Sequence, residues 1–330
     1  MDQIAQFLPE VPATLDMLEK ILLGCYSGQY DLPVASRIDL RLLIVALSKA
    51  TCIFPPSFLV TSIELTSLQS KFIGGYSSIY RGTCAEKSVA LKSLHTSGVD
   101  DLRYGQKSVE RLIPEVVPWR TLPHPHIVPV IGISRHVDID SSRPFVVLPW
   151  MDNGNARKYV EQFKGQGQIF KSRVNKLLHQ TALALSFMHS EDIMHGDLRG
   201  ANILVDPEGN AMVTDFGRYQ SWTAFENLDP SDYVKESGQW TITWKSDVYS
   251  FGCVCVKLYS CADPLGRMGD MDIVQMLLKD QVPVPKRPLR EGDEMSDTLW
   301  SLVDRCLQSK NPSLRPKAHE IADAGIISMI

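Results

Sequence analysis

The sequence predicts an α+β protein in three parts. Apolar residues recur at helical spacing in residues 1–66, short alternating segments bounded by turn residues follow in 67–148, and helical periodicity dominates 149–330. A length of 330 residues suits about two domains and allows a sizeable core. We therefore expect a short helical extension, then a small antiparallel sheet with one helix, and finally a mainly helical part.

The N-terminal extension suits two helices, over residues 14–23 and 37–47, each with one apolar face. Pro33 separates them, and the pair Pro55-Pro56 ends the second. The extension is either a small helical adaptor or a packing extension that covers the following domain. We favour the second interpretation.

Four apolar segments rich in β-forming residues predict the sheet. They are residues 71–82, which contain a glycine turn, 88–94, 127–133 and 144–148. The charged stretch 109–121 between them is the predicted helix. In the C-terminal part we expect strands at 201–205 and 211–215 around a DPEGN turn, and helices at 173–189, 247–259, 271–278, 297–306 and 317–324.

Composition and charge exclude several classes of protein. Hydrophobic residues make up 44% and charged residues 22%, which excludes wholesale disorder and collagen-like chains. The 38 acidic and 34 basic side chains give a formal charge of −4, so the chain has no strong electrostatic reason to bind nucleic acid or acidic lipid. We expect no nucleic-acid and no membrane partner.

Cysteine usage and the apolar segments indicate the compartment. The seven cysteines are scattered and form no Cys-x-x-Cys motif, which argues against a disulfide framework or a structural zinc site. The N-terminus has acids and no basic start, so it does not look like a signal peptide. The most hydrophobic stretch, residues 38–47, is far shorter than the ~20 residues of a membrane span. We expect a soluble cytoplasmic protein with reduced thiols.

The segment HGDLRGANILVDPEGNAMVTDFG, residues 195–217, carries the most informative chemistry. It places Asp197, Asn202 and Asp215 on loops that flank two short strands. One of these three side chains can act as an acceptor that orients or deprotonates a hydroxyl. The other two are hard oxygen ligands suited to Mg²⁺. Positioning and charge neutralisation of this kind supply nearly all the catalysis of phosphoryl transfer.

This segment resembles the catalytic loop and the Asp-Phe-Gly motif of protein kinases. Further motifs follow the same order: VALK ending at Lys92, SDVYSFG containing Asp247, and CLQSKNPSLRP containing Arg315. The similarity runs from about residue 67 to the end and implies a bilobal fold with a sheet-containing N-lobe (67–148) and a helical C-lobe (149–330). The stretches KATCIFPPSFLV, WRTLPHPHIVPVIG and VLPWMDNGNARKYV resemble the tyrosine-kinase-like enzymes abundant in mushroom-forming fungi, which usually phosphorylate serine or threonine.

The resemblance implies roles for individual residues in a site for ATP and Mg²⁺. Asp197 would accept the proton of the substrate hydroxyl, and Asn202 and Asp215 would hold the metal. Lys92 would contact the α- and β-phosphates, with Glu115 as its partner on helix C. Asp247 would brace the catalytic loop.

Other implied contacts surround the nucleotide between the lobes. Gly74 and Gly75 would cover its phosphates, and the hinge from Leu148 to Met151 would hold the purine, with Leu148 as gatekeeper. Arg199 stands where serine/threonine kinases often have lysine and would contact the transferred phosphate.

Several positions depart from the family pattern. Ser77 replaces the last glycine of the glycine-rich loop, so its Cβ weakens the approach to phosphate. Pro114 and Pro118 lie in the helix that carries Glu115, and we expect Pro118 to distort the segment that aims Glu115 at Lys92. Glu110 is a less favoured substitute partner.

The activation segment and the catalytic loop also depart from the family pattern. Gly196 replaces the arginine that normally receives an activation-loop phosphate. The Ala-Pro-Glu landmark is absent, and Glu236 is the candidate partner for Arg315. Without an acid there, we expect Arg315 to be exposed or a source of instability.

Three functions therefore stay open. The first is an active protein kinase, the second is a pseudokinase that serves as a nucleotide-binding or scaffold module, and the third is a small-molecule phosphotransferase, which often carries His-Gly-Asp. The sequence does not identify the protein substrate or the oligomeric state.

Overall fold

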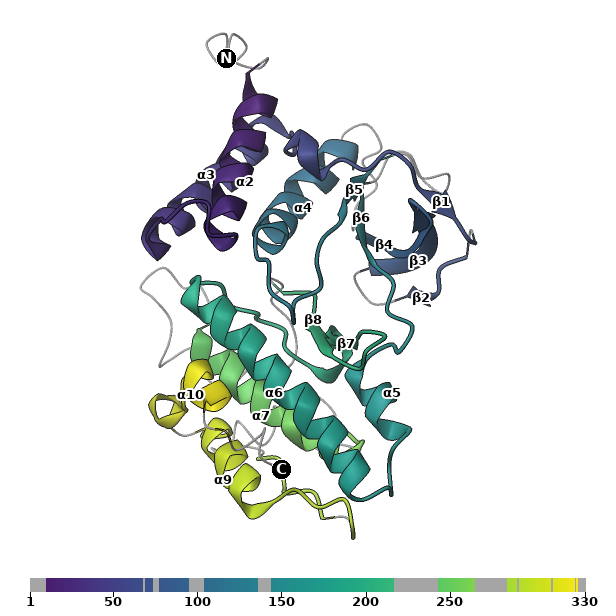
Figure 1. Ribbon diagram of the computed structural model, residues 1–330, viewed down its shortest axis with the longest axis vertical. Helices are drawn as coiled ribbons and strands as arrows, with labels where there is room; N and C mark the ends of the chain where they lie inside the picture. The colour runs from purple at the N-terminus through teal and green to yellow at the C-terminus, as the bar shows by residue number, and fades with distance from the viewer. Residues whose placement is uncertain are drawn as a thin grey trace. The chain divides into compact units, whose positions relative to one another are not determined.

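The computed structural model describes residues 10–67, 69–73, 77–94, 104–135, 144–216, 243–264, 284–289, 291–309, 311–323 and 325. The chain forms two compact units (Figure 1). The first unit consists of Met1–His124 and Val128–Trp150, and the second of Pro125–Ile127 and Met151–Ile330. The N-terminal extension thus belongs to the same unit as the small sheet.

The sheet of the first unit has the strand order β1-β3-β4-β6-β5, with β2 also paired to β3, and all pairs are antiparallel. Its strands are β1 (Glu64–Leu65), β2 (Phe72–Ile73), β3 (Ser77–Cys84), β4 (Lys87–Leu94), β5 (Gly132–Ser134) and β6 (Phe145–Pro149). Alternation along β4 places Val89 and Leu91 in an apolar cluster with Phe145 and Val147. Lys92 consequently points to the opposite face of the sheet.

The predicted strand over 127–133 is mostly wrong, because only its last two residues belong to β5. Pro129 lies in the middle of this segment and has no amide to donate to a strand ladder. Ile127 instead forms an isolated bridge with Val213 inside the second unit.

The extension forms two longer helices than expected, α2 (Val11–Tyr26) and α3 (Val34–Thr51), followed by the short helix η1 (Pro56–Phe58). Helix α3 packs on α2 and on α4 (Tyr104–Arg120), the single helix predicted beside the sheet. Leu15, Leu22 and Ile44 are fully buried in this packing. The contacts favour a packing extension over a separate adaptor.

The second unit is mainly helical. Its described helices are α5 (Ala156–Glu161), α6 (Gln168–Ser190), η3 (Gly200–Asn202), α7 (Trp244–Ser260), α9 (Asp297–Cys306), η5 (Pro312–Leu314) and α10 (Ala318–Asp323). Helix α7 begins with a capping box between Thr243 and Ser246. Inside the second unit, the hydroxyl of Tyr259 on α7 donates a buried hydrogen bond to Oδ1 of Asn175 on α6 at 2.6 Å. The helix predicted at 271–278 lies outside the described residues.

A short hairpin of β7 (Ile203–Val205) and β8 (Ala211–Val213) follows η3. The predicted DPEGN turn joins the strands, with the Asp206 carboxylate accepting from the Asn210 amide at 2.7 Å. Gly209 there has φ +76, and a Cβ would lie 2.7 Å from the Tyr159 hydroxyl oxygen, so a side chain does not fit. The hairpin therefore has a fixed turn next to the segment that carries Asp197.

Among the helices that the structure describes, none combines the length and the apolar character needed to cross a bilayer.

Candidate phosphoryl-transfer site

A buried ion pair joins the sheet of the first unit to α4. Lys92 Nζ lies 2.9 Å from Glu115 Oε1, and the two side chains are 1% and 7% exposed. Lys92 Nζ also lies 5.5 Å from the ring centroid of Trp119, one turn further along α4. The contact predicted between Lys92 and Glu115 is thus formed.

We expected Pro118 to disturb the contact between Glu115 and Lys92, and this expectation is wrong. The helix α4 continues through both prolines, and Glu115 still contacts Lys92. Pro114 is exposed and Pro118 is half-buried. Their missing amides leave the carbonyls of Glu110 and Pro114 without an intrahelical donor, and both of these residues are exposed, so water can reach them. Glu110 does not replace Glu115; its carboxylate accepts from Cys52 Sγ at 3.5 Å.

In the second unit, Asp247 of α7 fixes the turn that precedes Asp197. Its carboxylate accepts hydrogen bonds from the amides of His195 and Gly196, both at 2.8 Å, and contacts His189 Nε2 at 2.9 Å. Asp247 is 1% exposed, so these bonds lie away from water. The predicted bracing contact is present, and His189 is a partner that the sequence analysis missed, because a histidine near a helix end gives no distinctive signal.

His195 is a neutral, buried support for the same turn. Its Nδ1 accepts from the amide of Asp197 at 3.2 Å, and its ring meets Phe216 edge to face at 6.1 Å. Burial lowers the pKa of His195, an effect that outweighs the nearby carboxylates of Asp247 and Asp215. Gly196 has φ +77, a conformation that glycine adopts without strain and arginine does not.

Asn202 and Asp197 are held together directly. Asn202 Nδ2 donates to the backbone oxygen of Asp197 at 2.8 Å and to its Oδ2 at 3.0 Å. The amide of Thr214 donates to the backbone oxygen of Asn202 at 2.9 Å, so the residue before Asp215 is bonded to Asn202. Asp215 has φ +61, a strained backbone conformation of the kind found at functional sites.

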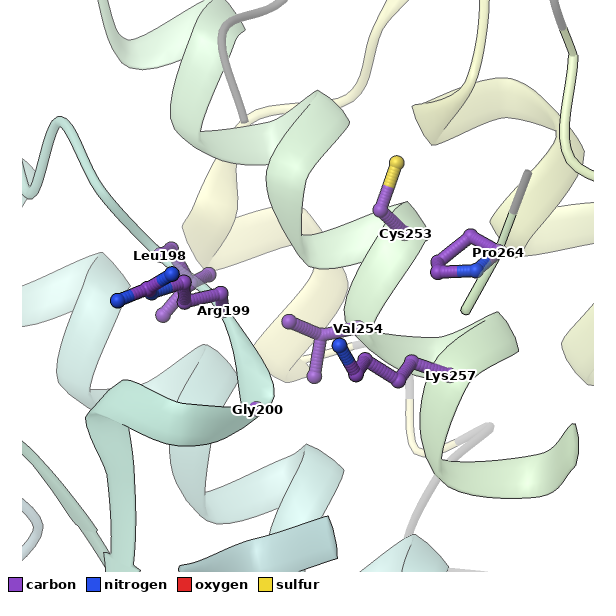
Figure 2. A pocket seen from close by; sticks show the side chains of 7 residues that line it. All are labelled: Leu198, Arg199, Gly200, Cys253, Val254, Lys257 and Pro264. Carbon is purple, nitrogen blue, oxygen red and sulfur yellow. The ribbon is translucent and has the colours of Figure 1, made fainter. Parts of the chain in front are cut away.

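Arg199 lies beside these groups, with Nε 3.7 Å from Asp197 Oδ2 and the side chain 41% exposed. It borders a shallow hollow that is open to solvent. Figure 2 shows Arg199 and Gly200 on one side of this hollow and Val254 and Lys257 of α7 on the other. An exposed cation thus adjoins the carboxylate of Asp197.

Comparison with known proteins matches residues 73–325 to the family model of the protein kinase domain. This chain belongs to the protein kinase family. Mitogen-activated protein kinase kinase kinase A of Dictyostelium discoideum is 25% identical over 260 residues, which cover 75% of this chain and 26% of that protein. Mitogen-activated protein kinase kinase kinase 3 of Arabidopsis thaliana is 23% identical over 269 residues, which cover 77% of this chain and 41% of that protein.

A third relative, serine/threonine-protein kinase pakH of Dictyostelium discoideum, is 26% identical over 252 residues, which cover 71% of this chain and 44% of that protein. The kinase chain thus spans less than half the length of each of these three relatives. The resemblance to the kinase family is confirmed, whereas the finer likeness to fungal enzymes stays a prediction.

The candidate ligands in the second unit of this chain fit Mg²⁺. The side-chain nitrogen of Asn202 donates hydrogen bonds to Asp197, so the side-chain oxygen, Oδ1, is the atom that can bind a metal. Asp215 adds a carboxylate. The part of the chain that the structure describes holds no group of three or more His, Cys, Asp or Glu residues arranged for a metal. Few protein ligands suit a cation that also takes phosphate oxygens and water.

The structure describes only some of the other residues predicted to surround the nucleotide. Gly74 and Gly75 lie outside the described residues, whereas Ser77 is the first residue of β3. Leu148 is buried in β6 opposite Ala90, and Met151 begins the second unit. Trp150, which the sequence analysis did not single out, stacks against Phe72 of β2 and lies under the Arg81 guanidinium.

Arg315 of the C-terminal signature is neither exposed nor isolated. It is 3% exposed, its Nε donates to the Gln308 oxygen at 2.8 Å, and its Nη1 donates to the Lys245 oxygen at 2.9 Å. Its guanidinium lies 4.9 Å from the ring centroid of Tyr249. Glu236, its candidate partner, lies outside the described residues. Backbone oxygens and an aromatic face therefore stabilise this buried cation.

Proposed function

We propose that the chain is an ATP-dependent protein kinase that transfers the γ-phosphate to a serine or threonine hydroxyl of a protein. The observation that carries the proposal is the pairing of Asn202 with Asp197 in a turn braced by Asp247. This arrangement holds one carboxylate as a proton acceptor next to an oxygen ligand for a metal. The buried pair of Lys92 and Glu115 supports it.

Each polar group then has a defined task in the reaction. Asp197 accepts a hydrogen bond from the substrate hydroxyl and takes its proton as the oxygen attacks the γ-phosphorus of ATP, whose bond to the bridging oxygen breaks so that ADP leaves. Asn202 Nδ2 keeps the Asp197 carboxylate in one orientation. Lys92, oriented by Glu115, donates to the non-transferred phosphates. Arg199 is exposed beside Asp197, where it can neutralise charge on the transferred group.

Mg²⁺ held by Asn202 and Asp215 would neutralise the charge that develops on the phosphate oxygens. Both residues are held at the ends of the β7–β8 hairpin by the bond between Thr214 and Asn202. This bond keeps the backbones of the two proposed ligands close together.

A protein is the proposed substrate, and serine or threonine the proposed acceptor. Relatives with the words serine/threonine-protein kinase in their names, such as pakH, support this choice.

The test is transfer of ³²P from labelled ATP by the full chain in the presence of Mg²⁺ and generic protein substrates. We expect Asp197→Asn to lower kcat by about 100-fold or more, because it removes the general base. The substitution keeps the size of the side chain. Wild-type transfer no faster than that of Asp197→Asn would instead indicate a scaffold module. Transfer to an aminoglycoside or choline but not to proteins would indicate a small-molecule phosphotransferase.

A further inference from the structure

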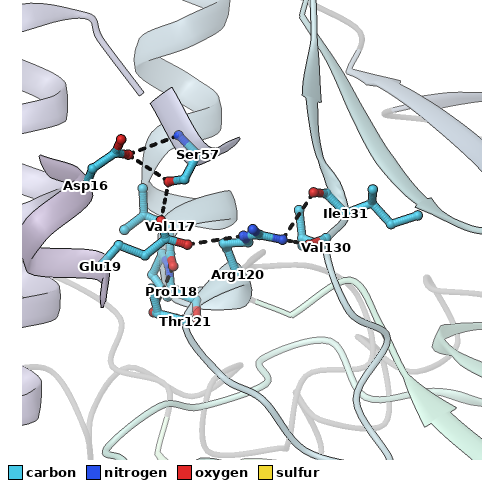
Figure 3. A network of polar contacts seen from close by, with 9 residues as sticks. All are labelled: Asp16, Glu19, Ser57, Val117, Pro118, Arg120, Thr121, Val130 and Ile131. Carbon is cyan, nitrogen blue, oxygen red and sulfur yellow. Dashed lines mark hydrogen bonds and ion pairs between the residues drawn. The ribbon is translucent and has the colours of Figure 1, made fainter. Parts of the chain in front are cut away.

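Polar side chains of the N-terminal extension contact the C-terminal end of α4. Figure 3 shows Glu19 of α2 between Ser57 and Arg120, the last residue of α4. Glu19 Oε1 lies 3.3 Å from Arg120 Nε, and the Glu19 side chain is 2% exposed. A buried carboxylate keeps its charge only with such partners, so the extension and α4 are bonded and not merely adjacent.

Arg41 of α3 makes a second connection to the same end of α4. Its Nε donates to the Thr121 hydroxyl at 3.2 Å, and its Nη2 donates to the Tyr26 hydroxyl at 2.8 Å. Thr121 Oγ1 in turn lies 2.9 Å from the backbone oxygen of Val117, in the last turn of the helix. Arg41 is 4% exposed and Thr121 is fully buried. The last turn is thus bonded to the extension through a buried chain of polar groups.

The far side of Arg120 is fixed as well. Its Nη1 donates to the backbone oxygens of Val130 and Ile131 at 2.5 and 3.1 Å, and its guanidinium lies 5.5 Å from the Phe58 ring centroid. The last turn of α4 is therefore held between the extension and the segment that leads into β5. Glu115 lies in the same part of the helix, five residues before Arg120.

This end of α4 needs external support because Pro118 cannot donate to the carbonyl of Pro114. The lost bond weakens the helix just after Glu115, the residue that holds Lys92. Hydrogen bonds from the extension supply the constraint that the helix itself lacks.

We infer that Glu19 and Arg41 are positioning residues, which hold α4 where Glu115 meets Lys92 and so make the N-terminal extension part of the phosphoryl-transfer machinery. The inference rests on the proposed kinase function. Neither residue touches the nucleotide; both act through Glu115 and Lys92. The extension is then a control point, since any factor that loosens it weakens the hold on Lys92.

The first test is amide hydrogen exchange of α4 in the full chain without nucleotide. Glu19→Gln keeps the shape of the side chain and removes its charge, and Arg41→Lys keeps the charge but loses the fork that spans Thr121 and Tyr26. We expect both to speed exchange in residues 112–121. Unchanged exchange in both variants would overturn the inference.

The matched control is Asp16→Asn. Asp16 lies on the same helix as Glu19 and bonds to the same Ser57, through its amide at 2.9 Å and its hydroxyl at 2.8 Å. Its substitution removes a contact within the extension and leaves the pair of Glu19 and Arg120 in place. We expect exchange in 112–121 to stay at the wild-type rate, and acceleration equal to that of Glu19→Gln would contradict the inference.

The second test is a double-mutant cycle on the Kd for MgATP. We expect Glu19→Gln to weaken binding about threefold to tenfold in the wild-type chain and by less than about twofold in Lys92→Met, because the effect passes through Lys92. An equal factor in both backgrounds would show general destabilisation and overturn the inference. Failure of the kinase function is distinguished by the wild-type chain itself, which would then transfer no phosphate.

Discussion

At the scale of residues, one carboxylate organises the turn before the proton acceptor. Asp247 accepts from two consecutive amides, those of His195 and Gly196, and this fixes the backbone that leads into Asp197. Gly196 makes the turn possible without strain because its φ is +77. Glycine at this position therefore suits the turn that Asp247 holds.

Buried histidines make the stability of the fold depend on pH. Burial lowers the pKa of both His195 and His126 from the ordinary value of 6.5. Below about pH 6.5 the unfolded chain binds protons that the folded chain excludes, so the free energy of unfolding falls as the pH falls. We expect a loss of up to about 1.4 kcal/mol per pH unit from His195 and a smaller one from the half-buried His126.

Urea unfolding at pH 7.5 and pH 5.5 measures this loss. His126→Asn is expected to reduce the difference in unfolding free energy between the two pH values, because it removes one of the two histidines. His319→Asn alters an exposed histidine and serves as the control. A chain more stable at pH 5.5 than at pH 7.5 would contradict the account.

The sequence predicted two contacts at the candidate site, Lys92 with Glu115 and Asp247 with the turn before Asp197, but none of the contacts that the extension makes. Lys92, Asn202 and Asp215 belong to local motifs, in which the order and spacing of neighbours carry the information. The bond between Arg120 and Glu19 joins residues 101 positions apart, and that between Arg41 and Thr121 joins residues 80 apart. No periodicity or motif indicates contacts of this kind, because they arise only when the helices pack.

At the scale of elements, α4 shows how a helix tolerates two prolines. The freed carbonyls belong to Glu110 and Pro114, on the exposed side of the helix, whereas Val116, Val117 and Trp119 are buried. Water can therefore solvate the freed carbonyls while the apolar side keeps its packing, but it does not join successive turns as an intrahelical bond would.

Replacing Pro118 with alanine should stabilise the protein. Pro118→Ala restores an amide that can donate to the carbonyl of Pro114, and we expect the free energy of unfolding to rise by about 1–2 kcal/mol in urea titrations. Pro33→Ala is the control, because Pro33 lies just before α3 with φ −55, where proline fits. An unchanged or lower unfolding free energy for Pro118→Ala would argue against the missing bond as a weakness of α4.

Long elements were predictable from the sequence, and short ones only in part. The helix predicted at 173–189 forms the interior of α6, and the strand predicted at 88–94 forms β4 almost in full. Helix α5 has six residues, too few for a periodic pattern, and was missed. The strand predicted at 201–205 starts instead with the helix η3, because the amide of Asn202 donates to the backbone oxygen of Arg199 at 2.8 Å and closes a tight turn.

At the scale of the whole molecule, the residues of the proposed reaction belong to both compact units. The first carries Lys92 and Glu115, and the second carries Asp197, Asn202 and Asp215. The predicted hinge, Leu148 to Met151, spans the point where the chain passes from one unit to the other. The proposed function requires that groups of both units act on one magnesium nucleotide.

Equilibrium binding of ATP with and without Mg²⁺ tests this claim most directly. We expect Mg²⁺ to strengthen binding to the wild-type chain by about tenfold, the effect of one charge-assisted interaction. Lys92→Met should weaken binding but keep the magnesium effect, and Asp215→Asn should lose that effect. Asp263→Asn, which alters an exposed pair with Lys257, is the control. A wild-type affinity that does not respond to Mg²⁺, or a full magnesium effect in Asp215→Asn, would contradict the account.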